Sequence, residues 1–172
     1  LHGISVRFVD YRRLAGGVQH AKFMIVDDRE AWLGSQNLDW RALSHIHELG
    51  ARITVEPVAR AVADVFETDW TAADTTQPAV PVDRKPAKWP VQFSQDGVSG
   101  RMWFGASPVK LNPPSTPWDR DLILERVNRA EREVVAWKSR SLGSHAAEDT
   151  VAHEFCHDLA RELRHLEPHP EG

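Results

Sequence analysis

The sequence predicts a mixed α/β fold, and three observations support this prediction. Before residue 57, short runs alternate apolar with polar residues, which is the period of half-buried strands. An amphipathic segment begins at residue 57, where apolar side chains recur every three or four positions. The 172 residues are 41% hydrophobic and 27% charged, which is typical of a folded globular chain rather than of a disordered or membrane-spanning one.

Four strands and a helix are expected in the first part of the chain. The strands cover residues 4–10, 20–26, 31–33 and 49–56. The turn-forming pair Asp27 and Asp28 separates the second strand from the third, so these two are expected to form a hairpin. Pro57 suits the first position of the helix, where its missing N–H would have no helical partner. One face of this helix carries Val58, Val62, Val65, Phe66 and Trp70.

The second part of the chain begins with a proline-rich segment. Residues 71–90 contain Pro78, Pro81, Pro86 and Pro90 and are expected to form an extended connector at a domain boundary. Beyond it we expect a strand over residues 101–104 and a helix with Thr116 as its N-cap and Pro117 at its first position. The buried stripe of that helix is expected to contain Leu122, Ile123, Val127 and Ala130. A short strand over 134–137 and a last amphipathic helix over 147–166 are expected to follow it.

Charge and cysteine content narrow the function classes. The net charge is -4 and like charges form no block, so any phosphate binding is expected to be local rather than spread over a basic surface. The single cysteine, Cys156, excludes an intrachain disulfide and a multi-cysteine zinc site. The sequence also lacks a signal-peptide pattern and any apolar run approaching the roughly 18 residues of a membrane span, so we expect no transmembrane segment, and the localisation stays open.

Residues 20–37 contain the pattern H-x-K, four residues, D, six residues, G-S-x-N. This pattern resembles the signature of the phospholipase D superfamily of phosphodiesterases. The residues after it, Leu38 to Leu43 and then Glu48 to Gly50, are similar to the first-motif region of the branch that contains the animal lysosomal phospholipase D-like exonucleases. The resemblance implies a phospholipase D-like lobe, in which helices flank a mixed sheet.

The spacing of the motif has a physical reason of its own. Residues two apart on a strand share a face, so His20 and Lys22 are expected to project together, while Ser35 and Asn37 bring a hydroxyl and an amide to the same place across the hairpin. An imidazole can attack phosphorus, and an ammonium with neutral donors can bind the phosphate oxygens, so the arrangement requires neither a metal ion nor a cofactor.

Two carboxylates complete the candidate site. A carboxylate that accepts the second ring N–H of a histidine sets its tautomer, and Glu48 is our candidate for that role, which the resemblance implies as well. Asp27 belongs to the motif, but we expect it first to orient the turn or to bind Lys22. The candidate catalytic residues are therefore His20, Lys22, Asp27 and Glu48, and the candidate phosphate-binding residues are Lys22, Ser35 and Asn37.

The resemblance also implies a second H-x-K motif, which this sequence does not contain. Family members use two such motifs, in which one histidine forms a phosphohistidine and the other protonates the leaving oxygen, whereas this sequence contains one H-x-K motif. Either two copies pair as a homodimer, or the chain is a fragment of a two-lobe protein, which we favour. The expected organisation is the C-terminal part of a lobe over 1–75, a connector over 76–90, the opening of a second lobe over 91–136 and a helical segment of unknown relation over 137–172.

A second motif competes with this interpretation. His153, Glu154 and His157 spell the H-E-x-x-H pattern of zinc metallopeptidases. Leu163 occupies the place of a third ligand in one such class, and the histidine pair lies opposite the apolar stripe of its helix, so we expect zinc binding here to be the weaker hypothesis.

The sequence thus predicts a metal-independent phosphodiesterase that cleaves or transfers a phosphodiester of a phospholipid head group or a nucleic acid. The absence of a basic surface argues mildly against long nucleic-acid tracks but not against short strands. The alternative is a non-catalytic single-motif fragment that binds phosphate at most.

Overall fold

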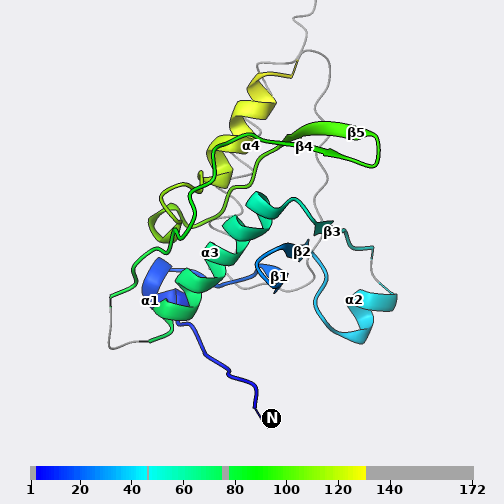
Figure 1. The fold of residues 1–172 in the computed structure, drawn as a ribbon. Helices are drawn as coiled ribbons and strands as arrows, with labels where there is room; N and C mark the ends of the chain where they lie inside the picture. Colours follow the sequence, from blue (N-terminus) through cyan, green and yellow to red (C-terminus); the bar gives the residue numbers. More distant parts are fainter. Residues whose placement is uncertain (1–2, 46, 75–77, 131–172) are drawn as a thin grey trace, which may run out of the picture. The chain divides into compact units, whose positions relative to one another are not determined.

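The computed structural model describes residues 3–45, 47–74 and 78–130. The chain divides into two units, Leu1–Pro117 and Trp118–Gly172, and each is considered by itself. The described residues form a mixed α/β structure, which confirms the predicted fold class (Figure 1). The predicted domain boundaries stay a prediction.

A three-stranded antiparallel sheet carries the motif. Its strands are β1 (Lys22–Val26), β2 (Glu30–Gly34) and β3 (Gly50–Ile53), in the order β1-β2-β3. Asp27 and Asp28 are the central residues of the turn between β1 and β2, which the N–H of Arg29 closes by donating to the carbonyl of Val26 at 3.0 Å. Their φ values of 54° and 55° are the left-handed conformation that aspartate tolerates and that a type I′ turn requires. The predicted hairpin is therefore confirmed, and its register pairs Lys22 with Gly34.

Helix α3 (Glu56–Ala72) covers one face of this sheet. The buried residues Val58, Ala59 and Val62 meet side chains of all three strands, and the strand residues in this core are Phe23, Ile25, Ala31, Leu33 and Ile53. Pro57 lies in the first turn, as predicted. Phe66 departs from the simple apolar stripe: it is 40% exposed, stacks on Trp70 and meets the Phe23 ring edge-on.

The predicted strand over residues 4–10 is wrong. These residues form no strand, and helix α1 (Tyr11–Ala15) follows them, with Asp10 as its N-cap and Gly16 in the left-handed conformation at its end. The alternating side chains Ile4, Val6 and Phe8 are 66%, 56% and 91% exposed. A half-buried strand needs a neighbouring strand, and none of the described strands pairs with this segment, although the Arg7 guanidinium lies over the Trp70 ring of α3.

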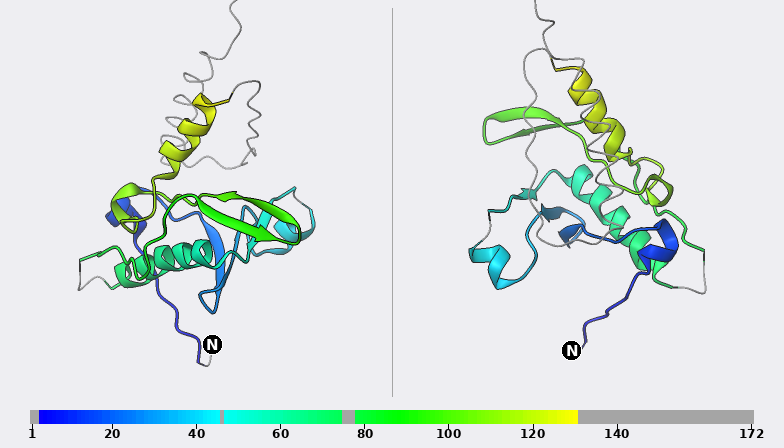
Figure 2. Two further views of the ribbon diagram at one scale, coloured as in Figure 1. Left: turned by 45° about the horizontal axis from the view of Figure 1, so that its top comes forward. Right: turned by 180° about the vertical axis from the view of Figure 1, so that it is seen from behind.

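The proline-rich segment contains neither helix nor strand over residues 78–90, as expected for an extended connector. It nevertheless lies against α3: the backbone N–H of Val82 donates to Thr68 Oγ1 at 2.9 Å, and Arg84 binds Asp64. After it, β4 (Val91–Gln95) and β5 (Val98–Met102) form a second hairpin (Figure 2). The strand predicted over 101–104 is thus real but begins three residues earlier.

In the second unit the structure describes helix α4 (Asp119–Asn128). The prediction of Thr116 as its N-cap is wrong, because the helix begins two residues later with Trp118 at that position, while Thr116 is buried in the first unit. Of the predicted stripe, Val127 is buried and Ile123 is 40% exposed. The predicted elements at 134–137 and 147–166 lie outside the described residues, as do His153, Glu154 and His157. Among the described helices, none combines the length and hydropathy needed to cross a membrane.

Candidate active site

His20 and Lys22 lie together at the start of β1. The Lys22 ammonium is 2.9 Å from His20 Nε2 and donates to the carbonyl oxygen of His20 at 2.7 Å. Because an ammonium has no acceptor, Nε2 must accept this hydrogen bond, and the ring proton of the neutral imidazole then resides on Nδ1. The structure thus brings together the side chains of His20 and Lys22, as the spacing of the motif predicts.

Ser35 and Glu48 form a second group, where β2 ends and β3 is about to begin. The Ser35 hydroxyl donates to Glu48 Oε2 and accepts from the backbone N–H of Leu49 at 3.0 Å. The backbone N–H of Ser35 donates to the carbonyl of Leu49 at 2.9 Å, which extends the pairing of these two strands. Glu48 therefore accepts from Ser35 instead of from His20, its expected partner, because the strand pairing places Ser35 next to it.

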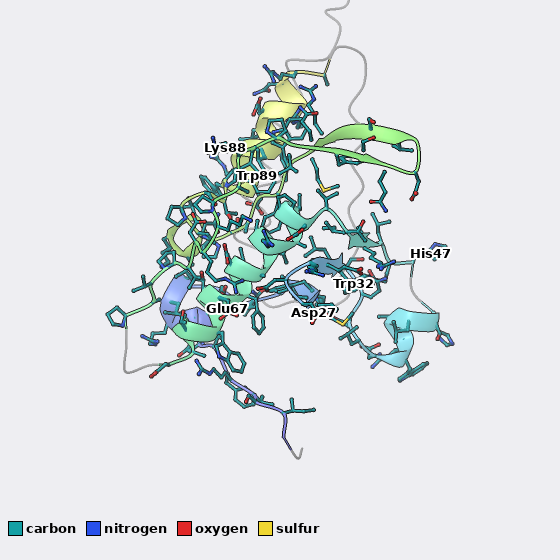
Figure 3. The ribbon with its side chains drawn as sticks, viewed as in Figure 1. Asp27, Trp32, His47, Glu67, Lys88 and Trp89 are labelled. Atoms are coloured by element: carbon teal, nitrogen blue, oxygen red, sulfur yellow. The ribbon has the colours of Figure 1, made fainter. Side chains whose placement is uncertain are left out.

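Asp27 and Asn37 lie apart from these contacts. Asp27 occupies the turn beyond the far end of the five-residue strand β1, so roughly 15 Å of extended chain separates it from Lys22. The expectation that it binds Lys22 is wrong for this reason. It lines an open pocket of about 440 Å³ with Phe66 and Glu67 of α3. Asp27 and Glu67 are labelled in Figure 3. Asn37 is exposed, two residues beyond Ser35.

Gly34 of the motif has a steric role that sequence reasoning missed. A Cβ at Gly34 would lie 2.4 Å from the ring of Trp32, and one at Gly50 would lie 2.9 Å from its Nε1. These glycines pair with each other across β2 and β3, and Gly34 also pairs with Lys22. The indole of Trp32, labelled in Figure 3, therefore lies against backbone that only glycine can supply, beside the strand that carries Lys22. Two glycines at facing positions of an expected sheet were the available signal.

The site is open to solvent. His20, Ser35 and Asn37 are exposed, and Lys22 and Glu48 are half-buried. Four large apolar side chains close in sequence to Ser35 and Glu48 are exposed too: Leu38 (68%), Trp40 (66%), Leu43 (64%) and Leu49 (77%). Trp40 and Leu43 belong to helix α2 (Trp40–Ser44), which the sequence analysis did not predict and which Asp39 caps through the N–H of Ala42. We call these four residues the apolar rim.

A polar cluster around the buried residues Tyr11 and Asp69, also missed from the sequence, includes Gln19, the exposed residue immediately before His20. The Tyr11 hydroxyl donates to Asp69 Oδ1, and Gln19 Nε2 donates to Asp69 Oδ2 at 2.8 Å. Burial raises the pKa of Asp69, against the hydrogen bonds from Tyr11 and Gln19, which lower it. Burial, together with the hydrogen bond to Asp69 and its negative charge, raises the pKa of Tyr11 far above its usual value of about 10. Polar residues at buried positions of an amphipathic helix, Asp69 among them, were the available signal.

The raised pKa of Tyr11 predicts a loss of stability at alkaline pH. The unfolded phenol ionises near pH 10, whereas the folded one keeps its proton, so the contribution to the free energy of unfolding is complete below about pH 10 and is lost as the pH rises above it. Tyr11 is the single tyrosine of the chain, so phenolate absorbance reports on it alone. We expect phenolate to appear only together with unfolding, and Tyr11→Phe to show a flatter fall in stability above pH 10. A phenolate titration near pH 10 in the folded protein would contradict the burial of this hydroxyl.

Comparisons with known proteins agree with the motif. Residues 1–70 match the family model described as cardiolipin synthase, PLD-like domain. This part of the chain is a phospholipase D-like domain. The resemblance seen in the sequence is thereby confirmed, including its similarity to the animal exonuclease branch.

Three curated relatives illustrate that similarity. The 5'-3' exonuclease PLD4 of Mus musculus is 36% identical over 136 residues, which cover 72% of this chain and 26% of that protein. Human 5'-3' exonuclease PLD4 is 34% identical over 147 residues (78% and 28%), and 5'-3' exonuclease PLD3 of Xenopus tropicalis is 29% identical over 145 residues (77% and 28%). The chain spans little more than a quarter of the length of these relatives.

The described residues bring together no evident metal-binding group. Within the ranges given above, no three or more His, Cys, Asp and Glu side chains come close enough to hold a metal ion.

Proposed function

We propose that the phospholipase D-like domain contributes one half of a phosphodiesterase active site, with His20 as nucleophile. The observation that carries this proposal is the contact of the Lys22 ammonium with His20 Nε2 at 2.9 Å on an exposed surface. When a phosphate binds here, one of its non-bridging oxygens accepts the hydrogen bond of the Lys22 ammonium in place of His20 Nε2. The Nε2 lone pair is then free for attack.

The reaction then proceeds by two displacements at phosphorus. His20 Nε2 forms a bond to phosphorus while the bond to the leaving oxygen breaks, and an acid from the other half of the site protonates that oxygen. Water next attacks phosphorus, the nitrogen–phosphorus bond breaks, and the same group of the other half takes the proton of the water. Lys22 and Asn37 bind the oxygens on which negative charge grows, and Ser35 joins them when its hydroxyl proton turns from Glu48 to the phosphate, so the proposal requires no metal ion.

The other half comes from outside residues 1–70, either from further chain of the whole protein or from a second copy. The apolar rim supports this step, because large exposed apolar side chains are typical of a surface that another protein surface covers. Glu48 has one clear role in this arrangement: it positions the Ser35 hydroxyl.

For the substrate we propose a phosphodiester of a nucleic-acid strand, since three relatives are named 5'-3' exonucleases. The family description names cardiolipin synthase, which makes a phospholipid phosphodiester the second candidate. Both candidate substrates react at a phosphodiester, and they differ only in the chemical groups attached to it.

The test is hydrolysis of bis(p-nitrophenyl) phosphate in excess EDTA over a range of protein concentrations. We expect metal-free release of p-nitrophenolate that rises faster than linearly with concentration if two copies complete the site. A short 5'-labelled oligonucleotide and phosphatidylglycerol vesicles, assayed in parallel, decide between the two substrates. Peptide mass analysis after an alkaline quench and digestion should show the phosphoryl adduct on the peptide that contains His20.

Three results would count against the proposal. Activity that EDTA abolishes in the folded protein would contradict the metal-independent mechanism. Activity strictly linear in concentration from a monomer would contradict the need for a second half. A folded chain without any activity would exclude completion of the site by a second copy, and would leave either a half supplied by further chain or a non-catalytic domain.

A further inference from the structure

Gln19 occupies a special position next to the proposed nucleophile. Its side-chain Oε1 accepts from the backbone N–H of Ala21 at 2.7 Å, so its amide spans His20 from the residue before it to the residue after it. Its Nε2 donates to Asp69 Oδ2 at 2.8 Å and lies 3.4 Å from the Tyr11 hydroxyl. A single side chain thus connects the backbone around His20 to helix α3.

The other end of this connection is rigidly held. Tyr11 and Asp69 are 7% and 9% exposed, and the Tyr11 hydroxyl donates to the second oxygen of the carboxylate. Hydrogen bonds to a buried charged group stabilise more than those between neutral groups, and removal of one partner leaves a buried oxygen unsatisfied. Helices α1 and α3 therefore fix the Asp69 carboxylate, and the carboxylate fixes Gln19.

His20 needs such support, because the sheet does not provide it. Strand β1 begins at Lys22, so the ladder of β1 and β2 starts after the histidine. The His20 side chain is exposed, and its ring meets the ammonium of Lys22, a flexible side chain. The bond from Gln19 to Ala21 therefore ties this exposed backbone to the buried carboxylate of Asp69.

We propose that Gln19, held by Tyr11 and Asp69, is a positioning residue that keeps His20 in the geometry for attack on phosphorus. This inference rests on the proposed function of His20. A displacement of about 1 Å in a reacting group can cost roughly 100-fold in rate, so loss of the Gln19 bonds is expected to lower kcat by up to about 100-fold. KM should change little, because Lys22, Ser35 and Asn37 still bind the phosphate.

The first experiment compares Gln19→Leu with Gln92→Leu, a matched change at an exposed glutamine of β4. We expect kcat to fall in Gln19→Leu only, and amide exchange at Ala21 to accelerate in that variant, since its N–H loses its acceptor. The His20 ring signals in NMR spectra should shift or broaden in Gln19→Leu and stay unchanged in Gln92→Leu. An unchanged kcat in folded Gln19→Leu would overturn the inference.

A double variant separates positioning from mere loss of stability. In Gln19→Glu with Asp69→Asn, the amide at position 69 can donate to the carboxylate at position 19, which still accepts from the N–H of Ala21. We expect this pair to recover kcat and the Ala21 protection relative to Gln19→Glu alone. Failure to recover either one, in a folded double variant, would overturn the inference. If Gln19→Leu does not fold, Tyr11→Phe, which removes a single bond from Asp69, takes its place in the comparison.

The result of the positioning test can be distinguished from a failure of the proposed function. If the wild-type chain hydrolyses nothing, the proposed function fails, and the test of positioning becomes the response of the His20 ring signals to inorganic phosphate. A phosphate-induced shift in wild type that is lost in Gln19→Leu would support positioning. Equal shifts in both proteins would overturn it.

Discussion

Replacing His20 with alanine is expected to reduce phosphodiester hydrolysis to the background of the assay. The change removes the atom that bonds to phosphorus, and removal of a nucleophile commonly lowers kcat by about 10⁴-fold or more. The fold should survive, because the His20 side chain is exposed and its ring meets the flexible side chain of Lys22. Rates of bis(p-nitrophenyl) phosphate hydrolysis in EDTA, measured beside the unfolding temperature, test both statements.

The matched control is His47→Ala, which removes an exposed imidazole close in sequence to Glu48. Its activity should stay near that of wild type, since His47 has no part in the proposed displacement. Equal rates for His20→Ala and wild type would show that another group attacks phosphorus. Equal losses in the two variants would show that the assay responds to general changes in this surface.

Local signals predicted much of the fold around this site. The Asp27-Asp28 turn and the alternation on either side of it specify a hairpin without reference to the rest of the chain. The same period of two brought His20 and Lys22 to one place, and the structure has their side chains in contact. Pro57 marked the start of α3 for an equally local reason.

The errors arose where a distant partner decides the structure. The alternation of Ile4, Val6 and Phe8 describes a strand only if another strand pairs with it, and no described strand does. Sequence intervals predict that Glu48 meets His20, whereas the β2–β3 pairing gives it Ser35. A pattern of residue types cannot show which of two nearby polar groups a carboxylate will meet.

The hydrogen bonds that support the backbone around His20 were missed because they too depend on partners distant in sequence. Tyr11 and Gln19 meet Asp69 across 58 and 50 residues of sequence, and neither is marked by periodicity. The apolar face of a helix is recognised by its apolar residues, so the pattern gave no weight to Asp69 although this residue is 9% exposed. A buried polar residue on such a face is informative in itself, because it needs a partner from elsewhere in the chain.

Replacing Arg84 with methionine is expected to lower the free energy of unfolding by about 3 kcal/mol. Arg84 Nε donates to Asp64 Oδ1 at 2.7 Å, and the Asp64 residue is only 3% exposed. Without the guanidinium, the carboxylate stays buried and keeps the hydrogen bond from the backbone N–H of residue 84, at 3.1 Å. Removing one member of a buried ion pair costs about 3–5 kcal/mol, and the partial exposure of Arg84 favours the lower end.

The same substitution at Arg52 provides the control. Arg52 pairs with Glu30 across the sheet, but the two side chains are 69% and 39% exposed, so Arg52→Met should cost less than about 1 kcal/mol. Adding Asp64→Leu to Arg84→Met should restore part of the lost stability, because both charged partners are then gone. Urea unfolding of the four proteins measures these differences as changes in midpoint at constant slope.

The comparison decides whether the proline-rich connector belongs to the folded domain. Arg84 also contacts Asp28 at 3.1 Å, so it joins the connector to both α3 and the tip of the β1–β2 hairpin. A cost for Arg84→Met that clearly exceeds that of Arg52→Met means that residues 78–90 stabilise the sheet on which Lys22 lies. Equal costs would mean that the connector leaves α3 in solution, and a boundary near residue 75 would then separate the domain from the later part of the chain, as the composition of the sequence predicts.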